Sequence, residues 1–143
     1  MFSKTCEYGI RAIIYLAGHS CMEKKLGIKE ISEAVGTPQH FTAKILQTLA
    51  KKGIIGSVKG PNGGFFIDNK SKSIQVIQVI YALEGDDFFK KCGLGLKHCS
   101  DKKPCPLHFE MKEMRETLET HLKVRSVQQL AAEVVDKKLR LHN

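Results

Sequence analysis

Three of the five cysteines in this 143-residue chain lie within one short stretch, residues 92–108, which reads CGLGLKHCSDKKPCPLH. Six residues separate Cys92 from Cys99, five separate Cys99 from Cys105, and two more precede His108. Neighbouring lysines favour the thiolate over the thiol, and the thiolate is the form that binds metal. Glycines at positions 93 and 95 let the backbone come close and turn its N–H groups toward a bound ion or cluster. The pattern predicts a metal-binding loop.

The length of the chain predicts one domain, with room for an appended element, that buries about two thirds of its unfolded surface. The odd number of cysteines argues against a disulfide framework, and no apolar run has the length of a signal peptide or a membrane span. We therefore expect a protein of the reducing cytoplasm that has no membrane partner. The net charge of +8 and the pI near 9.3 indicate an anionic partner.

Apolar residues at helical spacing predict a helix over residues 4–19 and a short second helix over residues 28–35 that stops at Gly36. Thr37 then supplies an N-cap, and Pro38 the first helical residue, for a third helix that ends at Gly53. The side chains expected to face inward in this third helix are Phe41, Ile45, Leu46 and Leu49. Two helices joined by so tight a turn predict a helix-turn-helix.

Between residues 54 and 67 the pattern changes to that of a β-hairpin. β-Branched residues at positions 54, 55 and 58 favour a strand, the turn-forming sequence GPNGG occupies positions 60–64, and a second apolar strand follows. We expect this hairpin to form a wing beside the helix-turn-helix. After it, Ser71 or Ser73 is expected to cap a buried helix that ends at Gly85. The apolar positions of this helix are Ile74, Ile77, Ile80, Tyr81 and Leu83.

The last part of the chain predicts two more helices. Pro106 opens a long one in which apolar residues recur at intervals of three and four, and this seam needs a partner. The seam consists of Leu107, Met111, Met114, Leu118 and Leu122. A final helix over residues 127–139 is expected to pack Leu130, Val134 and Val135. The predicted fold class is mainly α with a small β-wing. We divide it into a winged helix-turn-helix domain (1–85), a cysteine-rich loop (86–105), and a dimerisation helix with a C-terminal helix (106–143).

The basic charge is concentrated in the helix-turn-helix and its wing. Residues 34–67 contain no aspartate or glutamate, and four lysines lie there. Because this stretch contains the helix that would enter a major groove, we expect double-stranded DNA as the partner. The alternative is that the lysines form a solvated face and the glycines only a tight turn. The residues expected to contact DNA are Thr37, Gln39, His40, Lys44, Lys51 and Lys52 on the helix, and Lys59, Gly60, Asn62 and Gly63 on the wing.

The chain resembles the iron-sulfur-cluster regulator (IscR) family of bacterial winged-helix transcription factors over nearly its whole length. The resemblance rests on YGIRA at positions 8–12, IKEIS at 28–32, LAKKGII at 49–55, VKGPNGGF at 58–65, and three cysteines at nearly the family spacing. It implies a homodimeric regulator, a repressor, that binds a pseudo-palindromic operator. It also implies an iron-sulfur cluster held by Cys92, Cys99 and Cys105.

The resemblance leaves two residues for the fourth ligand. His108 lies three positions after Cys105, as in the regulator of cluster assembly, where a histidine at that spacing completes a 2Fe-2S site. Glu7 matches an acidic residue that, in nitric-oxide-sensing and redox-sensing relatives, reaches the cluster from the partner subunit. We favour His108, and a 2Fe-2S over a 4Fe-4S cluster, since an imidazole in place of a thiolate raises the potential and suits a sensor. Because the loop joins the predicted helices at Gly85 and Pro106, we expect an occupied site to fix how each winged domain sits on the dimer axis.

Two other hypotheses use the same loop differently. A zinc ion on the same three cysteines and histidine would be structural, and a metal-free loop whose thiols form a disulfide would be an oxidation switch. No nucleotide or flavin fingerprint and no catalytic dyad occurs in the sequence, so we expect no enzyme. His98 is a reserve ligand, and Cys6 and Cys21 are expected to be buried or partly buried.

Overall fold

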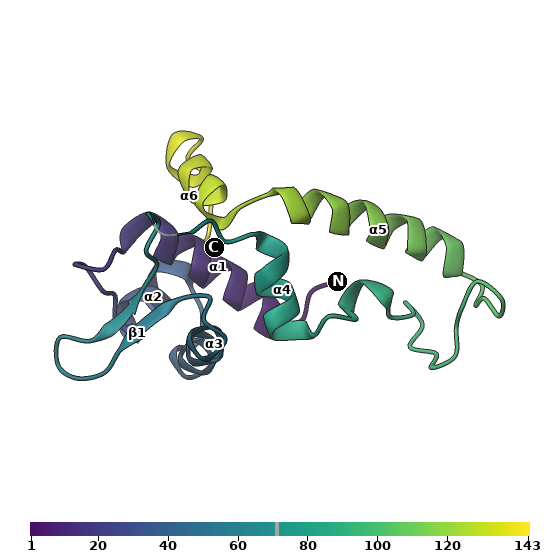
Figure 1. Cartoon of the computed structure of the whole chain (residues 1–143), viewed down its shortest axis with the longest axis horizontal. Coiled ribbons are helices and arrows are strands. Elements are labelled where there is room, and N and C mark those ends of the chain that lie inside the picture. Colours follow the sequence, from purple (N-terminus) through teal and green to yellow (C-terminus); the bar gives the residue numbers. More distant parts are fainter. Residues whose placement is uncertain (71) are drawn as a thin grey trace.

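The computed structural model describes residues 1–70 and 72–143, which form six α-helices, one 3-10 helix and a two-stranded antiparallel sheet (Figure 1). The predicted class, mainly α with a small β-wing, is confirmed. Ser71, one of the two predicted helix caps, lies outside the described residues. The elements are α1 (Lys4–His19), α2 (Ile28–Val35), α3 (Gln39–Lys51), β1 (Gly56–Val58), β2 (Gly64–Phe66), α4 (Val76–Glu84), the 3-10 helix η1 (Phe88–Lys90), α5 (His108–Val124) and α6 (Val127–Asp136). Within the described ranges, no helix is long and apolar enough to cross a membrane.

α1 lies at the centre of the fold and has the bounds that the sequence predicts. Its N-cap is Ser3, whose hydroxyl oxygen accepts a hydrogen bond from the backbone N–H of Cys6 at 3.1 Å. The helices α2, α3, α4 and α6 all pack against it. Each large apolar side chain buried there stabilises the fold by about 1.5–3 kcal/mol relative to an exposed one. Because four helices pack on it, α1 is the scaffold for the rest of the fold. The buried residues of α1 are Cys6, Gly9, Ala12, Ile13, Ile14, Leu16 and Ala17.

The helix-turn-helix forms as predicted, but the start of α3 differs in two ways. Pro38 lies just before α3, and Thr37 caps no backbone group of α3, because its buried hydroxyl is hydrogen-bonded to the hydroxyl of Thr42 at 2.6 Å. Phe41, expected inside, is 54% exposed, since Thr42 takes the inward position on that turn. Thr42 lies three, four and seven residues before the buried Ile45, Leu46 and Leu49, which is the spacing of one helix face.

The wing is a short hairpin tied to the body by a third segment. β1 pairs with β2 so that Gly56 faces Phe66 and Val58 faces Gly64. Leu26, from the segment before α2, exchanges two backbone hydrogen bonds with Phe65, at 2.9 and 2.8 Å. The first strand starts at Gly56, later than the predicted start at residue 54, because the chain at 53–54 still hydrogen-bonds back to the end of α3. The tip, residues 59–62, is exposed.

α4 begins later than predicted and uses a different cap. Ser73 is exposed, and the helix starts after Gln75, whose backbone N–H donates to Oε1 of Gln78 at 2.7 Å. Ile74 stays outside the helix because its carbonyl oxygen accepts a hydrogen bond from the N–H of Val127 at 2.7 Å. This extended pairing fixes the start of α6 against the start of α4. The predicted end at Gly85 is confirmed, and the buried residues are Val76, Ile77, Val79 and Ile80.

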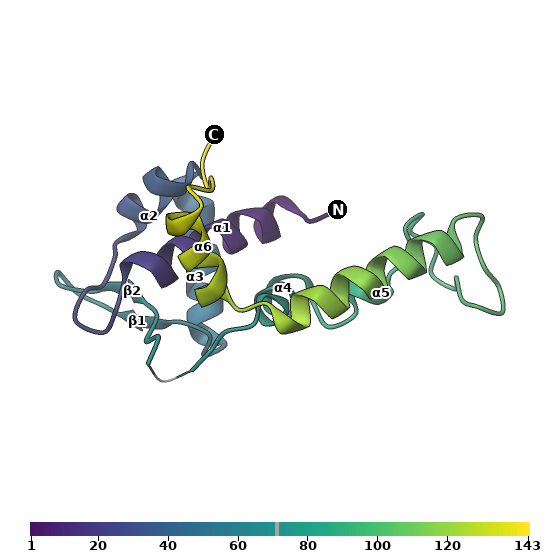
Figure 2. The same ribbon diagram turned by 90° about the horizontal axis from the view of Figure 1, so that it is seen from above.

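α5 projects from the winged body and carries the cysteine loop at its far end, as both views show (Figures 1 and 2). It starts at His108, two residues later than predicted, because Pro106 and Leu107 lie in the turn before it. Only His108 is buried in this helix, whereas Met114 of the predicted seam is 42% exposed. Leu118 and Leu122 of the predicted seam are partly buried against the core of the same chain. The large apolar residues that α5 leaves exposed are Phe109, Met114 and Val124.

α6 packs on α1 and departs from the prediction in two ways, its end and the exposure of Val135. Leu130 and Val134 pack against the core, as expected, but the helix ends at Asp136, and Val135 is 65% exposed. Val135 lies about 100° around the helix from Val134 and so points away from α1.

Candidate metal centre

The cysteine loop connects η1 to α5 and folds so that its three sulfurs converge. Cys92 follows η1 by two residues, and Cys105 precedes α5 by three. The Sγ atoms of Cys92, Cys99 and Cys105 all lie within 4.8 Å of one another, and those of Cys92 and Cys105 are 3.7 Å apart. None of them is in a disulfide. The predicted gathering of these cysteines is therefore present in the fold.

Backbone N–H groups face the first of these sulfurs. Hydrogen bonds from the N–H groups of Leu96 and then Leu94 lower the pKa of Cys92 to about 7, against a smaller opposing effect of burial. Gly95 makes this turn possible, since its φ of +75° is open to glycine and strained for other residues. The loop thus stabilises the thiolate at neutral pH, which is the form that a metal needs.

Cys99 has the opposite tendency. A hydrogen bond from the N–H of Cys105, at 3.3 Å, lowers the pKa of Cys99, but burial and the neighbouring Cys105 and Cys92 thiols outweigh it, and the pKa lies above its ordinary value. Three sulfurs so close together cannot all be charged without a cation between them. A metal ion held by these cysteines would supply that charge.

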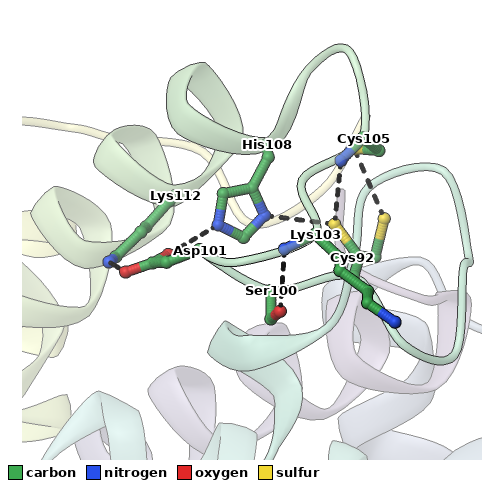
Figure 3. Close-up of polar contacts among 8 residues, drawn as sticks. Cys92, Ser100, Asp101, Lys103, Cys105, His108 and Lys112 are labelled. Atoms are coloured by element: carbon green, nitrogen blue, oxygen red, sulfur yellow. Dashed lines mark hydrogen bonds and ion pairs between the residues drawn. The ribbon is translucent and has the colours of Figure 1, made fainter.

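His108 lies beside the sulfurs and is held from both sides (Figure 3). Its Nδ1 is 3.1 Å from Sγ of Cys99, and its Nε2 is 2.7 Å from Oδ1 of Asp101. The other oxygen of Asp101 accepts a hydrogen bond from Nζ of Lys112 at 2.7 Å. These contacts to Lys112 and then to His108 lower the pKa of Asp101, so the carboxylate is ionised. His108 is 9% exposed, and its ring contacts Cys99. The set of ligand atoms that all lie within 4.8 Å of one another consists of the three cysteine sulfurs and does not include His108.

The sulfur spacing fits metal coordination. Two thiolates on one tetrahedral ion, with metal–sulfur bonds of about 2.3 Å, lie about 3.8 Å apart, and the Cys92–Cys105 separation is 3.7 Å. A solvent-open hollow of about 400 Å³ adjoins Cys92 and Cys99 and is lined by Asp87, Lys90, Lys91, Gly95, Leu96 and Lys97. The loop can therefore hold a metal ion, and the site is accessible from solvent.

The other predicted ligands and cysteines lie elsewhere. Glu7 is on α1, where it forms an ion pair with Lys4 at 3.0 Å, and His98 is exposed on the loop. Cys6 is fully buried, as expected. Cys21 is exposed, contrary to the prediction, because it sits in a tight turn and pairs through its backbone with Lys24.

Sequence reasoning missed Asp101 and Lys112. The available signal was the spacing of Lys112, which follows His108 by one helical turn and so projects on the same side of α5. Nothing in the sequence pattern singled out Asp101 among the polar residues of the loop.

Most residues predicted to contact DNA are exposed. Gln39, His40 and Lys44 are exposed on α3, and Lys59, Gly60 and Asn62 are exposed at the wing tip, with Gly63 partly buried. Thr37 is buried in its bond to Thr42. Lys51 is exposed, and the ammonium of Lys52 donates to the carbonyl oxygen of Ala82 at 2.6 Å. Residues 34–67, which include α3 and the wing, carry four lysines and no acidic residue.

A helix-turn-helix followed by a two-stranded wing is a winged-helix fold, and helix-turn-helix proteins of this kind place their second helix in the major groove of DNA. Residues 2–133 match the Rrf2 family, described as an iron-dependent transcriptional regulator. The chain belongs to the Rrf2 family, whose members are transcriptional regulators and not enzymes.

Individual relatives agree with this assignment. A helix-turn-helix transcriptional regulator of Aquifex aeolicus (strain VF5) is 30% identical over 133 residues, which cover 91% of this chain and 90% of the relative. The regulator IscR of Photorhabdus laumondii is 27% identical over 131 residues, covering 90% and 79%. The structure of T. potens IscR superposes with a TM-score of 0.72 at 21% identity, over 97% of this chain and 91% of that one, and shows the shared fold.

Proposed function

We propose that this regulator is a homodimer that binds operator DNA under the control of an iron-sulfur cluster held by Cys92, Cys99, Cys105 and His108. The observation that carries the proposal is the convergence of three sulfurs, with an imidazole nitrogen 3.1 Å from one of them, at the junction of η1 and α5. The relatives named IscR, and the description of the family as iron-dependent, support iron as the metal.

We favour a 2Fe-2S over a 4Fe-4S cluster because the donor set would combine thiolates with an imidazole, His108, whose Nδ1 lies 3.1 Å from Sγ of Cys99. Histidine replaces cysteine as a ligand in a class of 2Fe-2S centres. The partner's Glu7 is the alternative fourth ligand, and its ion pair with Lys4 would have to open first.

Each part of the chain has its own role in this proposal. Residues 1–85 bind DNA, and residues 86–105 hold the cluster. Residues 106–143 provide α5, which pairs with a second copy, and α6, which packs on α1. The exposed apolar surface of α5 supports the dimer. Two recognition helices must then meet major grooves about 34 Å apart.

A bound cluster would supply the positive charge that holds the thiolates together and a redox state that can change. The protein's own residues transmit that change. The loop is anchored at one end to η1, which packs on α4 and α5, so rearranging the loop alters the angle between α5 and the winged body. Operator affinity then depends on occupancy. Repression of target genes, from a cytoplasmic location, is the role that follows.

The second candidate is a structural zinc ion on the same donors. The observation in its favour is the Cys92–Cys105 separation of 3.7 Å, the edge of a tetrahedral thiolate site. The third candidate is a metal-free switch in which the same two thiols lose two electrons and two protons to an oxidant such as a peroxide and form a disulfide.

One experiment separates the three. The protein is purified without oxygen, and its iron, acid-labile sulfide, zinc and visible absorption are measured for wild type, Cys99→Ala, His108→Ala and Glu7→Ala. We expect the wild type to contain iron and sulfide in equal amounts and to absorb visible light. The Cys99→Ala variant should lose the iron, the sulfide and the absorption. Zinc without sulfide supports the structural site. No metal, together with a mass change that reductant reverses, supports the thiol switch.

DNA binding is tested separately with the same preparations on a duplex that contains the operator. We expect affinity to differ between the loaded and the metal-free dimer. Equal affinity would refute control by the cluster while leaving the DNA-binding activity in place.

A further inference from the structure

The imidazole of His108 is fixed in direction by partners on both of its nitrogens. Nδ1 faces Sγ of Cys99 at 3.1 Å, and Nε2 faces Oδ1 of Asp101 at 2.7 Å. A carboxylate only accepts hydrogen bonds, so the contact with Asp101 requires hydrogen on Nε2. In the neutral ring this leaves the lone pair on Nδ1, which is the nitrogen that faces the sulfurs.

Asp101 is itself held by Lys112. The ammonium of Lys112 lies 2.7 Å from Oδ2 of Asp101, and Lys112 follows His108 by four residues on α5. Because side chains four residues apart share one side of a helix, His108 and Lys112 both reach from α5 to the carboxylate of Asp101, which lies on the loop. The chain Cys99–His108–Asp101–Lys112 therefore runs from the sulfurs to α5. Figure 3 shows its last three members.

We propose that Asp101 is a positioning residue for the metal centre, which fixes the tautomer and direction of His108 so that Nδ1 is presented to the metal that Cys99 binds. The inference rests on the proposed function, in that His108 is taken to be a ligand of a metal at this site. It adds the residue that makes His108 a competent ligand.

The role has an expected effect on the metal. A carboxylate that accepts the far N–H of a ligating imidazole makes the ring a better electron donor and holds it in place. Removing such a partner typically weakens metal binding about 10- to 100-fold. Loss of the negative charge near the centre also raises its reduction potential, since the reduced form carries more negative charge.

A merely structural role for Asp101 makes a different prediction. If Asp101 only fastened the loop to α5 through Lys112, then Lys112→Met would do the same damage as Asp101→Ala. The positioning role predicts that Lys112→Met has the smaller effect, because the contact between Asp101 and His108 survives.

The test uses four variants of the full chain: Asp101→Ala, Asp101→Asn, Lys112→Met, and Lys102→Ala as a control at an exposed position of the same loop. The first readout is the His108 tautomer in metal-free protein, read from ¹⁵N chemical shifts and assigned with His108→Gln. We expect hydrogen on Nε2 in wild type, Asp101→Asn and Lys102→Ala, and a mixture of tautomers in Asp101→Ala.

The second readout is the loaded protein. After anaerobic reconstitution with iron and sulfide, Asp101→Ala should lose iron to a chelator at least tenfold faster than wild type, shift the EPR g-values of the reduced cluster, and raise its potential. Asp101→Asn keeps an acceptor for the N–H and should restore iron retention, while its potential stays above that of wild type because the charge is gone. Lys102→Ala should match wild type.

Two failures are distinguishable. Wild type that holds iron and sulfide while Asp101→Ala keeps the same tautomer, g-values, potential and iron retention overturns the positioning role and leaves the proposed function standing. Wild type that binds no iron overturns the proposed function, and cobalt(II) added to the same protein then decides the inference. A cobalt affinity that Asp101→Ala lowers tenfold supports it, and an unchanged affinity or no cobalt binding overturns it.

Discussion

The hydroxyl of Tyr81 on α4 donates a hydrogen bond to Oε1 of Glu119 on α5 at 2.7 Å. This contact joins the last helix of the winged body to the long helix that carries the cysteine loop. It raises the pKa of Tyr81 to about 12 and lowers the pKa of Glu119, with the hydrogen bond as the largest cause in both cases. The hydrogen bond that joins α4 to α5 is therefore made by a protonated Tyr81 and an ionised Glu119.

Replacing Tyr81 with Phe should therefore lower the free energy of unfolding at pH 7 by about 1 kcal/mol. The folded state lowers the pKa of Glu119, so its contribution is present above the carboxyl's unfolded pKa and is lost as the pH falls through the lowered folded value. The folded state raises the pKa of Tyr81, so that contribution disappears as the pH rises from 10 through about 12. Urea unfolding at several pH values measures the difference between wild type and Tyr81→Phe, which should shrink at both extremes. Glu119→Gln keeps an acceptor for the Tyr81 hydroxyl and should lower the free energy of unfolding at pH 7 by less than Tyr81→Phe does.

The wing should tolerate no side chain at Gly64. Its φ is +146°, and an added Cβ would lie 2.6 Å from the carbonyl oxygen of Leu26, whose backbone pairs with Phe65. Gly64→Ala should lower the free energy of unfolding by more than about 1 kcal/mol. Gly27→Ala is the matched control, since Gly27 has φ of −81° and nothing within 4 Å of an added Cβ, and should change it by less than about 0.5 kcal/mol. Thermal unfolding of both variants checks this, and equal losses would contradict the account of the wing.

Operator binding should weaken steeply with salt, and the wing should supply part of that dependence. If four lysines in each subunit meet phosphates, eight contacts give a slope of log affinity against log salt of about −7 as an upper bound. Lys59→Ala should make the slope shallower by about 2 in a dimer, because it removes two contacts. Lys123→Ala on α5, which is paired with Glu119, should leave the slope unchanged. Fluorescence anisotropy across a salt series measures both, and a wild-type slope near zero would count against the lysine contacts.

The exposed part of the α5 seam, at Met114, should be needed for pairing with a second copy. Met114 is 42% exposed in the single chain, and covering apolar surface is the expected source of dimer stability. Met114→Asp places a charge in that surface and should raise the fraction of monomer at micromolar concentration, as sedimentation equilibrium would show. Thr120→Asp adds the same charge to an exposed position on another side of α5 and should keep the dimer. A dimer that survives Met114→Asp would move the interface elsewhere.

The two cysteines outside the loop should differ sharply in reactivity. Cys6 is fully buried, and burial, then Glu84 and Glu7, raise the pKa of its thiol to about 12, whereas Cys21 is exposed. Native protein treated with iodoacetamide at pH 8 should be alkylated at Cys21 and not at Cys6, as peptide mass spectrometry can establish. In urea Cys6 should become reactive, because its pKa then returns toward the ordinary value. Labelling of Cys6 in the native state would show that α1 is less well packed than the structure indicates.

Much of the fold was readable from local patterns. The bounds of α1 and α2, the helix-turn-helix, the turn at residues 60–64 and the end of α4 at Gly85 follow from helical periodicity and from glycine and proline at particular places. The gathering of Cys92, Cys99 and Cys105 was also readable, since a loop of this length with glycines can bring its own sulfurs together. Such features are set by residues near one another in sequence.

Some features that sequence reasoning missed depend on contacts between distant segments, and others on local contacts. α4 starts at Val76 because residues 74–76 pair with residues 125–127. Phe41 is exposed because Thr42 packs inward with Thr37, which is only five residues away in the sequence. The ionised Asp101 between His108 and Lys112 exists only because the loop folds back onto α5. The sequence alone determined which segments are helices, which is the wing and which residues can offer sulfur to a metal. The tertiary structure decided which side chains those segments bury and how the histidine beside the sulfurs is held, since burial and hydrogen bonding depend on neighbours that the chain brings together only when folded.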